Sequence, residues 1–178
     1  MSSPTPSIVL IGMMGAGKSS VGRLLARRTG LARFDTDEWI VSKTGMSIAD
    51  IFEREGETGF RELETSALNE LHPAGSAVIV TGGGIVLREE NVKLLKRLGF
   101  VVWLEAEEDI LFERASRVGN RPLLQTANPR VSLSEMLRVR APLYAGAADF
   151  RVETTYLKQD EVADIILAEV DRRTGAPA

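Results

Sequence analysis

The chain has 178 residues, of which 44% are hydrophobic, so it is long enough to bury one core and too short for two ordinary domains. Its net charge of −3 argues against a nucleic-acid binder driven by counterion release, and the absence of cysteine excludes disulfides, thiolate metal sites and cysteine nucleophiles. A single histidine disfavours a histidine-based zinc site and a serine–histidine triad.

No apolar run approaches the length that spans a bilayer, and the N-terminus has neither the basic nor the apolar part of a signal peptide. We therefore expect a cytoplasmic protein with no membrane or nucleic-acid partner. A single domain should extend over residues 1–178, with a core at about 7–171 and frayed ends at 1–6 and 174–178.

The first apolar run, residues 8–11, leads into a glycine-rich stretch at 12–19, and a helical pattern then continues to Gly30. Strand, glycine loop and helix in this order are the context of a phosphate-binding P-loop, whose backbone N–H groups attract a polyphosphate. Lys18 is placed to reach the β- and γ-phosphates, and the Ser19 hydroxyl to ligate Mg²⁺. The alternative, a chance glycine turn with a capping serine, should match these fixed positions in about one chain of this length in a hundred.

Short apolar runs alternate with amphipathic helical patterns along the chain, which predicts a parallel sheet with helices on both faces. The predicted strands are residues 7–11, 32–35, 77–81, 100–104 and 150–153. Ligands bind beyond the carboxyl ends of the strands in such sheets, so polar motifs at those ends are the candidates for function.

Asp35 and Asp37 stand at the end of the second predicted strand. Two carboxylates one residue apart can divide their work, one toward a metal and the other toward a substrate hydroxyl. The alternative is that Asp37 only caps a helix that begins at Glu38.

Residues 51–64 read as two helices broken near Gly56, and Glu64 falls on the apolar stripe of the second helix. A buried acid is costly unless it is paired, and Arg61 lies three residues before it. The alternative is an ordinary ion pair at the surface.

The third predicted strand is followed by Gly82, Gly83 and Gly84. Three successive glycines lose much conformational entropy on folding, so we expect a ligand to approach the bare backbone closely. A flexible turn is the alternative.

The segment 114–151 contains seven arginines, no lysine and two acids, a net charge of +5. The use of arginine without lysine suggests that planar guanidinium groups bind phosphates or carboxylates through paired hydrogen bonds. Residues 118–130 are polar and show no period, which is typical of a mobile lid, and Arg121 within it could swing onto a transferred phosphate.

A helix is predicted to start near Ser132, and its buried side includes Leu133, Tyr144 and also Arg140, whereas Arg138 points away. A guanidinium keeps its proton, so Arg140 needs an anionic partner there. That partner can be either the carboxylate of a bound substrate or a carboxylate of the protein.

Six motifs resemble the shikimate kinase family, which belongs to the nucleoside-monophosphate-kinase-like P-loop group: GMMGAGKS, DTD, FEREGETGFRELE, TGGG, RPLL and RAPLY. The resemblance covers nearly all of residues 8–170. It implies a five-stranded parallel sheet flanked by helices on both faces, with a mobile lid at about 118–131. It also implies transfer of phosphate from MgATP to the 3-hydroxyl of shikimate, a step of aromatic amino-acid biosynthesis.

The resemblance also implies roles for individual residues. The residues expected at ATP are Gly15, Ala16, Gly17, Lys18, Ser19, Ser20, Arg114 and Arg121, with Arg114 stacked on the adenine. Those expected at shikimate are Asp37, Arg61, Gly82, Gly83, Gly84 and Arg140, with Phe52, Phe60 and Glu64 shaping the pocket. Lys18, Asp37 and Arg121 would be catalytic, and Mg²⁺ would be held by Ser19 and, through water, by Asp35.

Two other functions stay open at this point. Another small-molecule kinase of the same fold, such as one acting on gluconate, would need no carboxylate clamp beside a ring-sized pocket. A ligand-sensing module without turnover should have lost Lys18, Asp37 or the lid arginine, and all three are present. We expect a monomeric enzyme.

Overall fold

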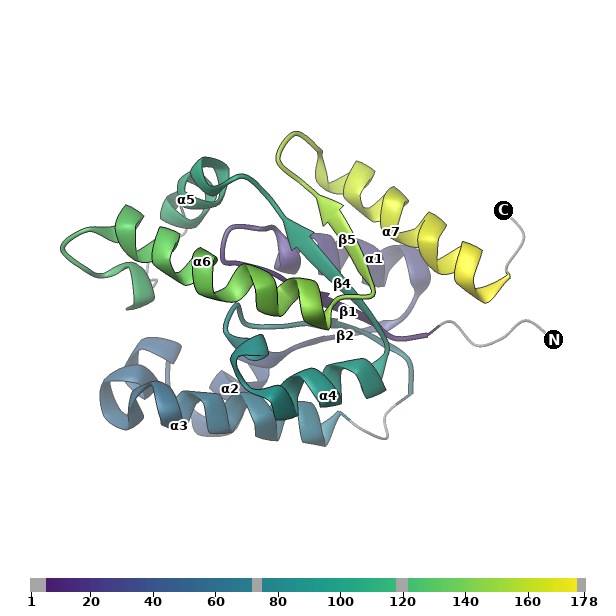
Figure 1. The fold of residues 1–178 in the computed structure, drawn as a ribbon. Helices are drawn as coiled ribbons and strands as arrows, with labels where there is room; N and C mark the ends of the chain where they lie inside the picture. The colour runs from purple at the N-terminus through teal and green to yellow at the C-terminus, as the bar shows by residue number, and fades with distance from the viewer. Residues whose placement is uncertain (1–5, 72–74, 118–121, 176–178) are drawn as a thin grey trace.

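The computed structural model describes residues 6–71, 75–117 and 122–175. Its five strands form one parallel sheet in the order β2-β3-β1-β4-β5 (Figure 1). The strands are β1 (Ile8–Ile11), β2 (Ala32–Asp35), β3 (Ala77–Val80), β4 (Phe100–Glu105) and β5 (Phe150–Glu153). The predicted five-stranded parallel sheet is confirmed, and the ends of β1, β3 and β4 differ from the prediction by one residue each.

The central strands are apolar on both faces because helices cover both sides of the sheet. All four residues of β1 are fully buried, and Val9 at its middle pairs with Ile79 on one side and Val101 on the other. The strand that carries the glycine loop is therefore the most deeply held part of the core.

The described ranges contain seven α-helices, which connect the strands or follow the last one. They are α1 (Lys18–Thr29), α2 (Thr36–Thr44), α3 (Ile48–Glu70), α4 (Glu89–Leu98), α5 (Glu108–Arg117), α6 (Pro129–Ala147) and α7 (Gln159–Thr174). Helices α1 and α7 pack together on one face of the sheet, while α3, α4 and α6 lie on the other (Figure 1). In the described residues no helix is both long and apolar enough to cross a membrane.

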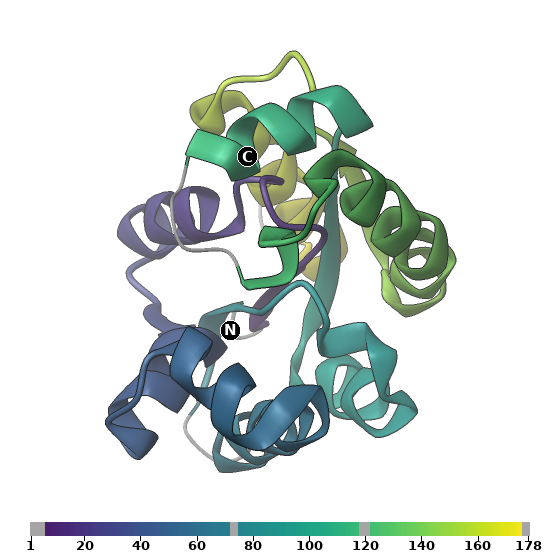
Figure 2. The same cartoon turned by 90° about the vertical axis from the view of Figure 1, so that its left-hand side faces the viewer.

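The break predicted near Gly56 is confirmed. Gly56 has φ 69° and ψ −176°, a backbone conformation that a glycine adopts at low cost, and it divides α3 into two helical parts. The second part carries Arg61 and Glu64 toward the carboxyl ends of the strands. Figure 2 looks onto this end of the molecule, where α3 lies below the P-loop turn.

The start predicted near Ser132 for the helix that carries Arg140 is wrong by three residues. Helix α6 begins at Pro129, a residue suited to the first turn, and the Asn128 side chain accepts a hydrogen bond from the Val131 N–H. Residues 129–131 of the expected lid are therefore helical, and residues 122–124 form a short 3-10 helix, η2 (Pro122–Leu124). Arg121 and the rest of 118–121 lie outside the described residues.

Candidate active site

A cavity of about 430 Å³ lies at the carboxyl ends of β1, β2 and β3. The glycine-rich loop after β1, the aspartates after β2 and the glycines after β3 meet there, as the parallel sheet predicts. The expected residues that line it are Gly15, Gly17, Lys18, Ser19, Ser20, Asp35, Asp37, Gly82, Gly83 and Arg114. Met14, Arg23 and Gln159, which the sequence did not single out, line it as well.

Lys18 is folded back over the glycine loop and is only 8% exposed. Its Nζ donates hydrogen bonds to the Gly12 carbonyl at 2.7 Å and to the Met13 carbonyl at 3.0 Å. The loop thus holds the ammonium at the wall of the cavity, where a polyphosphate would meet it.

The capping of α2 is done by Asp35, so the alternative that assigned the cap to Asp37 is wrong. Helix α2 begins at Thr36, and the Asp35 Oδ1 accepts from the N–H groups of Asp37 at 3.1 Å and Glu38 at 3.4 Å. The Asp35 Oδ2 lies 3.3 Å from the Arg33 guanidinium, and burial raises the pKa of the Asp35 carboxyl. Asp37 is left to line the cavity.

A smaller pocket of about 80 Å³ adjoins the first and contains all nine residues expected at the substrate: Asp37, Phe52, Phe60, Arg61, Glu64, Gly82, Gly83, Gly84 and Arg140. Met14, Ile48 and Leu123 complete its lining. The two pockets share Met14, Asp37, Gly82 and Gly83, so one aspartate faces both a phosphate-binding loop and a second ligand site.

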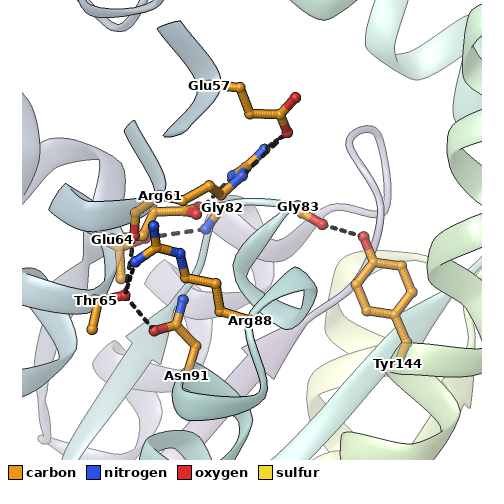
Figure 3. A network of polar contacts seen from close by, with 10 residues as sticks. Glu57, Arg61, Glu64, Thr65, Gly82, Gly83, Arg88, Asn91 and Tyr144 are labelled. Carbon is orange, nitrogen blue, oxygen red and sulfur yellow. Dashed lines mark hydrogen bonds and ion pairs between the residues drawn. The ribbon is translucent and has the colours of Figure 1, made fainter. Parts of the chain in front are cut away.

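Arg61 and Glu64 form a buried ion pair, so the alternative of a surface pair is wrong. Arg61 is 5% exposed, Glu64 is fully buried, and Nη1 lies 2.6 Å from Oε2 (Figure 3). Glu57, one turn earlier, accepts from the same guanidinium at 2.9 Å. Burial raises the pKa of the Glu64 carboxyl to about 7; Arg61 opposes this rise, and Asp37 adds to it.

Two of the three glycines make room for the charged side chains of the pocket. A Cβ on Gly82 would lie 2.7 Å from the Glu64 Oε1 and 2.9 Å from the Asp37 Oδ1. A Cβ on Gly84 would overlap the Arg61 guanidinium. Glycine is therefore required here, as expected. The expected reason was the close approach of a ligand, whereas the protein's own side chains already exclude a Cβ.

Arg140 lies on the buried side of α6, as predicted, and Arg138 is exposed. Arg140 is only 4% exposed, its Nη1 has no hydrogen-bond partner, and no carboxylate in the described residues forms an ion pair with it. A buried cation in this state is costly, and a bound anion would remove the cost.

A third cavity, of about 420 Å³, adjoins the P-loop on the side of α7. Arg114 lines it and donates from Nη2 to the carbonyls of Thr154 at 3.1 Å and Thr155 at 3.2 Å. Ala16 and Gly17 of the P-loop also line it. The guanidinium is thus fixed where a nucleotide base could stack on it.

Sequence reasoning missed several residues of the site. Glu57 could have been found, because it stands four residues before Arg61 on a helix. The Thr36 hydroxyl accepts from the Gly82 N–H at 3.1 Å and so ties two motifs together, which no local pattern indicates. Leu123 and Ile48 reach the pocket only through tertiary packing.

The sheet order, the P-loop and the adjoining pockets define a kinase of the nucleoside-monophosphate-kinase-like P-loop class. The sequence model of the family described as shikimate kinase matches residues 14–171. The chain is 46% identical over 166 residues to shikimate kinase of Thermodesulfovibrio yellowstonii, across 93% of this chain and 95% of that protein. The chain therefore belongs to the shikimate kinase family.

Solved structures agree with this assignment. The structure of shikimate kinase from Acinetobacter baumannii in complex with shikimate is similar to this chain with a TM-score of 0.91. The two sequences are 42% identical, and the match covers 94% of each chain. A gluconokinase from Sinorhizobium meliloti has a TM-score of 0.60 at 20% identity, covering 96% of this chain and 94% of that one. The second likeness is one of fold alone.

Proposed function

We propose that this protein transfers the γ-phosphate of MgATP to the 3-hydroxyl of shikimate. The observation that carries the proposal is Arg140, a buried guanidinium for which the described part of the chain offers no ion pair, in the same pocket as Asp37. A substrate that presents a carboxylate and ring hydroxyls satisfies both side chains at once. The curated relatives named shikimate kinase support this choice of substrate over other small alcohols.

Substrate binding rests on charge and shape together. Arg61 is already balanced by Glu64 and Glu57, so Arg140 is the cation with charge to spare for a substrate carboxylate. Phe52 and Phe60, with ring centroids 4.7 Å apart, form an apolar wall against which a six-membered ring can lie.

Phosphoryl transfer requires alignment and charge neutralisation more than covalent chemistry. Lys18, the P-loop N–H groups and Arg121 would balance the charge that spreads over the γ-phosphate in the transition state. Asp37 stands where the two pockets meet, so it would align the acceptor hydroxyl and take its proton late in the reaction.

The residues near the P-loop fit a Mg²⁺ ion that keeps most of its water. Ser19 and Asp35 line the same cavity, and the described residues contain no cluster of three His, Cys, Asp or Glu ligands. Mg²⁺ is commonly bound in this way, by one or two protein groups and the substrate phosphates. Ser19 would hold the ion directly and Asp35 through water, because the Asp35 carboxylate already caps α2. When bound, the ion supplies charge neutralisation at the phosphates.

Leu123 of η2 lines the smaller pocket between α3 and α6. A segment 118–131 that closes over the substrate would exclude water and so limit wasteful hydrolysis of ATP. We also propose that the enzyme is a monomer built on a single domain, the domain count following from the length of the chain.

The test is a coupled ADP-release assay with MgATP, run with shikimate, gluconate, quinate or no acceptor. We expect release that depends on shikimate, at a typical kinase rate of about 1–100 per second. Release that depends on gluconate instead would identify the other kinase. A protein that binds ATP and turns over none of the three would be a sensor, and the proposal would be wrong.

A further inference from the structure

Tyr144 connects three parts of the site without lining either pocket in which the reaction is proposed to occur. It is fully buried on α6, one turn after Arg140. Its hydroxyl donates to the Gly83 carbonyl (Figure 3). The Met13 Sδ of the P-loop lies 3.7 Å from the same oxygen. Its ring packs against Trp103 of β4, with centroids 5.9 Å apart, so the hydroxyl is held in place from behind.

The backbone that Tyr144 contacts is a glycine turn seen in one form, and its stereochemistry allows a second. The Ile85 N–H donates to the Gly82 carbonyl at 3.3 Å, and Gly84 has φ −96° and ψ 2°. These are the angles of the third residue in a type I turn. The type II turn differs by rotation of one peptide, here that of Gly83 and Gly84, and it needs a positive φ at the third residue, which glycine adopts readily.

The two forms present opposite groups to the pocket. In the observed form the Gly83 carbonyl points to Tyr144, and Arg61 and Glu64 lie on the other side of Gly83 (Figure 3). Carbonyl and N–H point in opposite directions across a trans peptide, so the Gly84 N–H is directed away from Tyr144. Rotation would instead turn a carbonyl oxygen toward Glu64 and the other groups of the pocket.

We propose that Tyr144 is a positioning residue, whose hydroxyl holds the Gly83–Gly84 peptide with its N–H, and not its carbonyl, toward the substrate pocket. This role rests on the proposed function, because an N–H assists binding of a carboxylate or a hydroxyl oxygen and a carbonyl repels a carboxylate. Burial raises the pKa of Tyr144 to about 12, so the hydroxyl keeps the proton that it donates.

The test removes one oxygen atom. Tyr144→Phe keeps the ring that packs on Trp103, so the fold should be retained. We expect the KM for shikimate to rise about tenfold, the size of effect that loss of one buried hydrogen bond produces, and the KM for ATP to change less than about twofold. Tyr156→Phe is the matched control, because that hydroxyl is exposed and donates to Glu107.

A second measurement does not depend on turnover. In ¹⁵N-labelled protein without substrate, the Gly84 amide should give one resonance in the wild type, and a doubled or strongly shifted resonance in Tyr144→Phe. An unchanged Gly84 resonance, or equal changes in both KM values, would overturn the positioning role. If the wild type shows no turnover of shikimate, the proposed function fails, and the resonance alone decides whether Tyr144 sets the turn.

Discussion

Asp37 stands between the P-loop cavity and the substrate pocket, a position that suits the acceptor hydroxyl. Asp37→Asn should lower kcat by at least about a hundredfold, because an amide cannot take the proton, while the Kd for ATP stays within about twofold. Glu38→Gln is the control, since Glu38 is exposed on the same helix and pairs with Arg33. Steady-state kinetics and ATP titration measure both quantities, and a variant that retains more than about a tenth of the rate would contradict the base role.

Arg140 is expected to favour substrate binding and to lower the stability of the fold. Arg140→Met should raise the KM for shikimate about a hundredfold and leave the KM for ATP nearly unchanged. The same change should increase the free energy of unfolding by about 1–3 kcal/mol, because it removes a buried charge that has no ion pair.

Kinetics and urea unfolding test these two effects of Arg140→Met. Arg138→Met serves as the control, because that guanidinium is exposed two residues earlier on α6 and should change neither quantity. Equal effects of Arg140→Met on the two KM values would contradict the clamp.

Glu64 should make stability depend on pH in a defined window. Its pKa is raised from 4.5 to about 7 on folding, so between these values the folded state binds a proton that the unfolded state has lost. The Glu64 contribution to the free energy of unfolding therefore falls as pH rises from about 4.5 to 7, by up to about 3 kcal/mol, and is constant above 7. Below about 4.5 Glu64 is protonated in both states, so its contribution no longer changes with pH.

Urea unfolding of wild type and Glu64→Gln at pH 4.5, 6 and 8 isolates this contribution, because all other groups are common to both proteins. The cost of the glutamine substitution should shrink as pH rises. A cost that is independent of pH would show that folding does not shift the pKa of Glu64.

At the scale of elements, the glycine turn that follows β3 packs against α3, whose Arg61 side chain leaves no room for a Cβ on Gly84. Gly84→Ala should lower the free energy of unfolding by about 1–3 kcal/mol, because its Cβ would overlap the Arg61 guanidinium. Gly83→Ala should change it by no more than about 1 kcal/mol, since its Cβ would lie 3.4 Å from the Met14 nitrogen and 3.7 Å from the Tyr144 hydroxyl. Thermal and urea unfolding compare the pair, and equal losses would show that Arg61 does not set the turn.

Apolar periodicity was enough to predict all five strands, and the rule that ligands bind at their carboxyl ends brought the three motifs to one site. Capping was harder to predict, because Asp35 and Asp37 are equally good capping residues and only the observed start of α2 at Thr36 selects Asp35. The start of α6 was missed because Asn128 and Pro129 are typical of loops as well as of helix starts. The hydrogen bond from Tyr144 to Gly83 spans 61 residues, and no local pattern predicts it.

For the molecule as a whole, the substrate pocket is assembled from α2, α3, α6, η2 and the loops that follow β1 and β3, so ligand binding should stabilise elements from most of the chain. Shikimate at one hundred times its Kd should add about 2.7 kcal/mol to the free energy of unfolding. For a chain of this length that corresponds to a rise in Tm of about 5–10 °C. Gluconate also carries a carboxylate, but it is an open chain that cannot lie against the wall formed by Phe52 and Phe60 as a six-membered ring can, so gluconate should raise Tm less than shikimate does.

Thermal unfolding of wild type and Arg140→Met with shikimate, with MgATP and with both ligands separates the two sites. MgATP should stabilise both proteins alike, because the P-loop and Arg114 are untouched by the change. Shikimate at the same concentration should stabilise the wild type and hardly shift the variant. A variant that shikimate still stabilises fully would place the carboxylate elsewhere, with Arg61 as the remaining cation of the pocket.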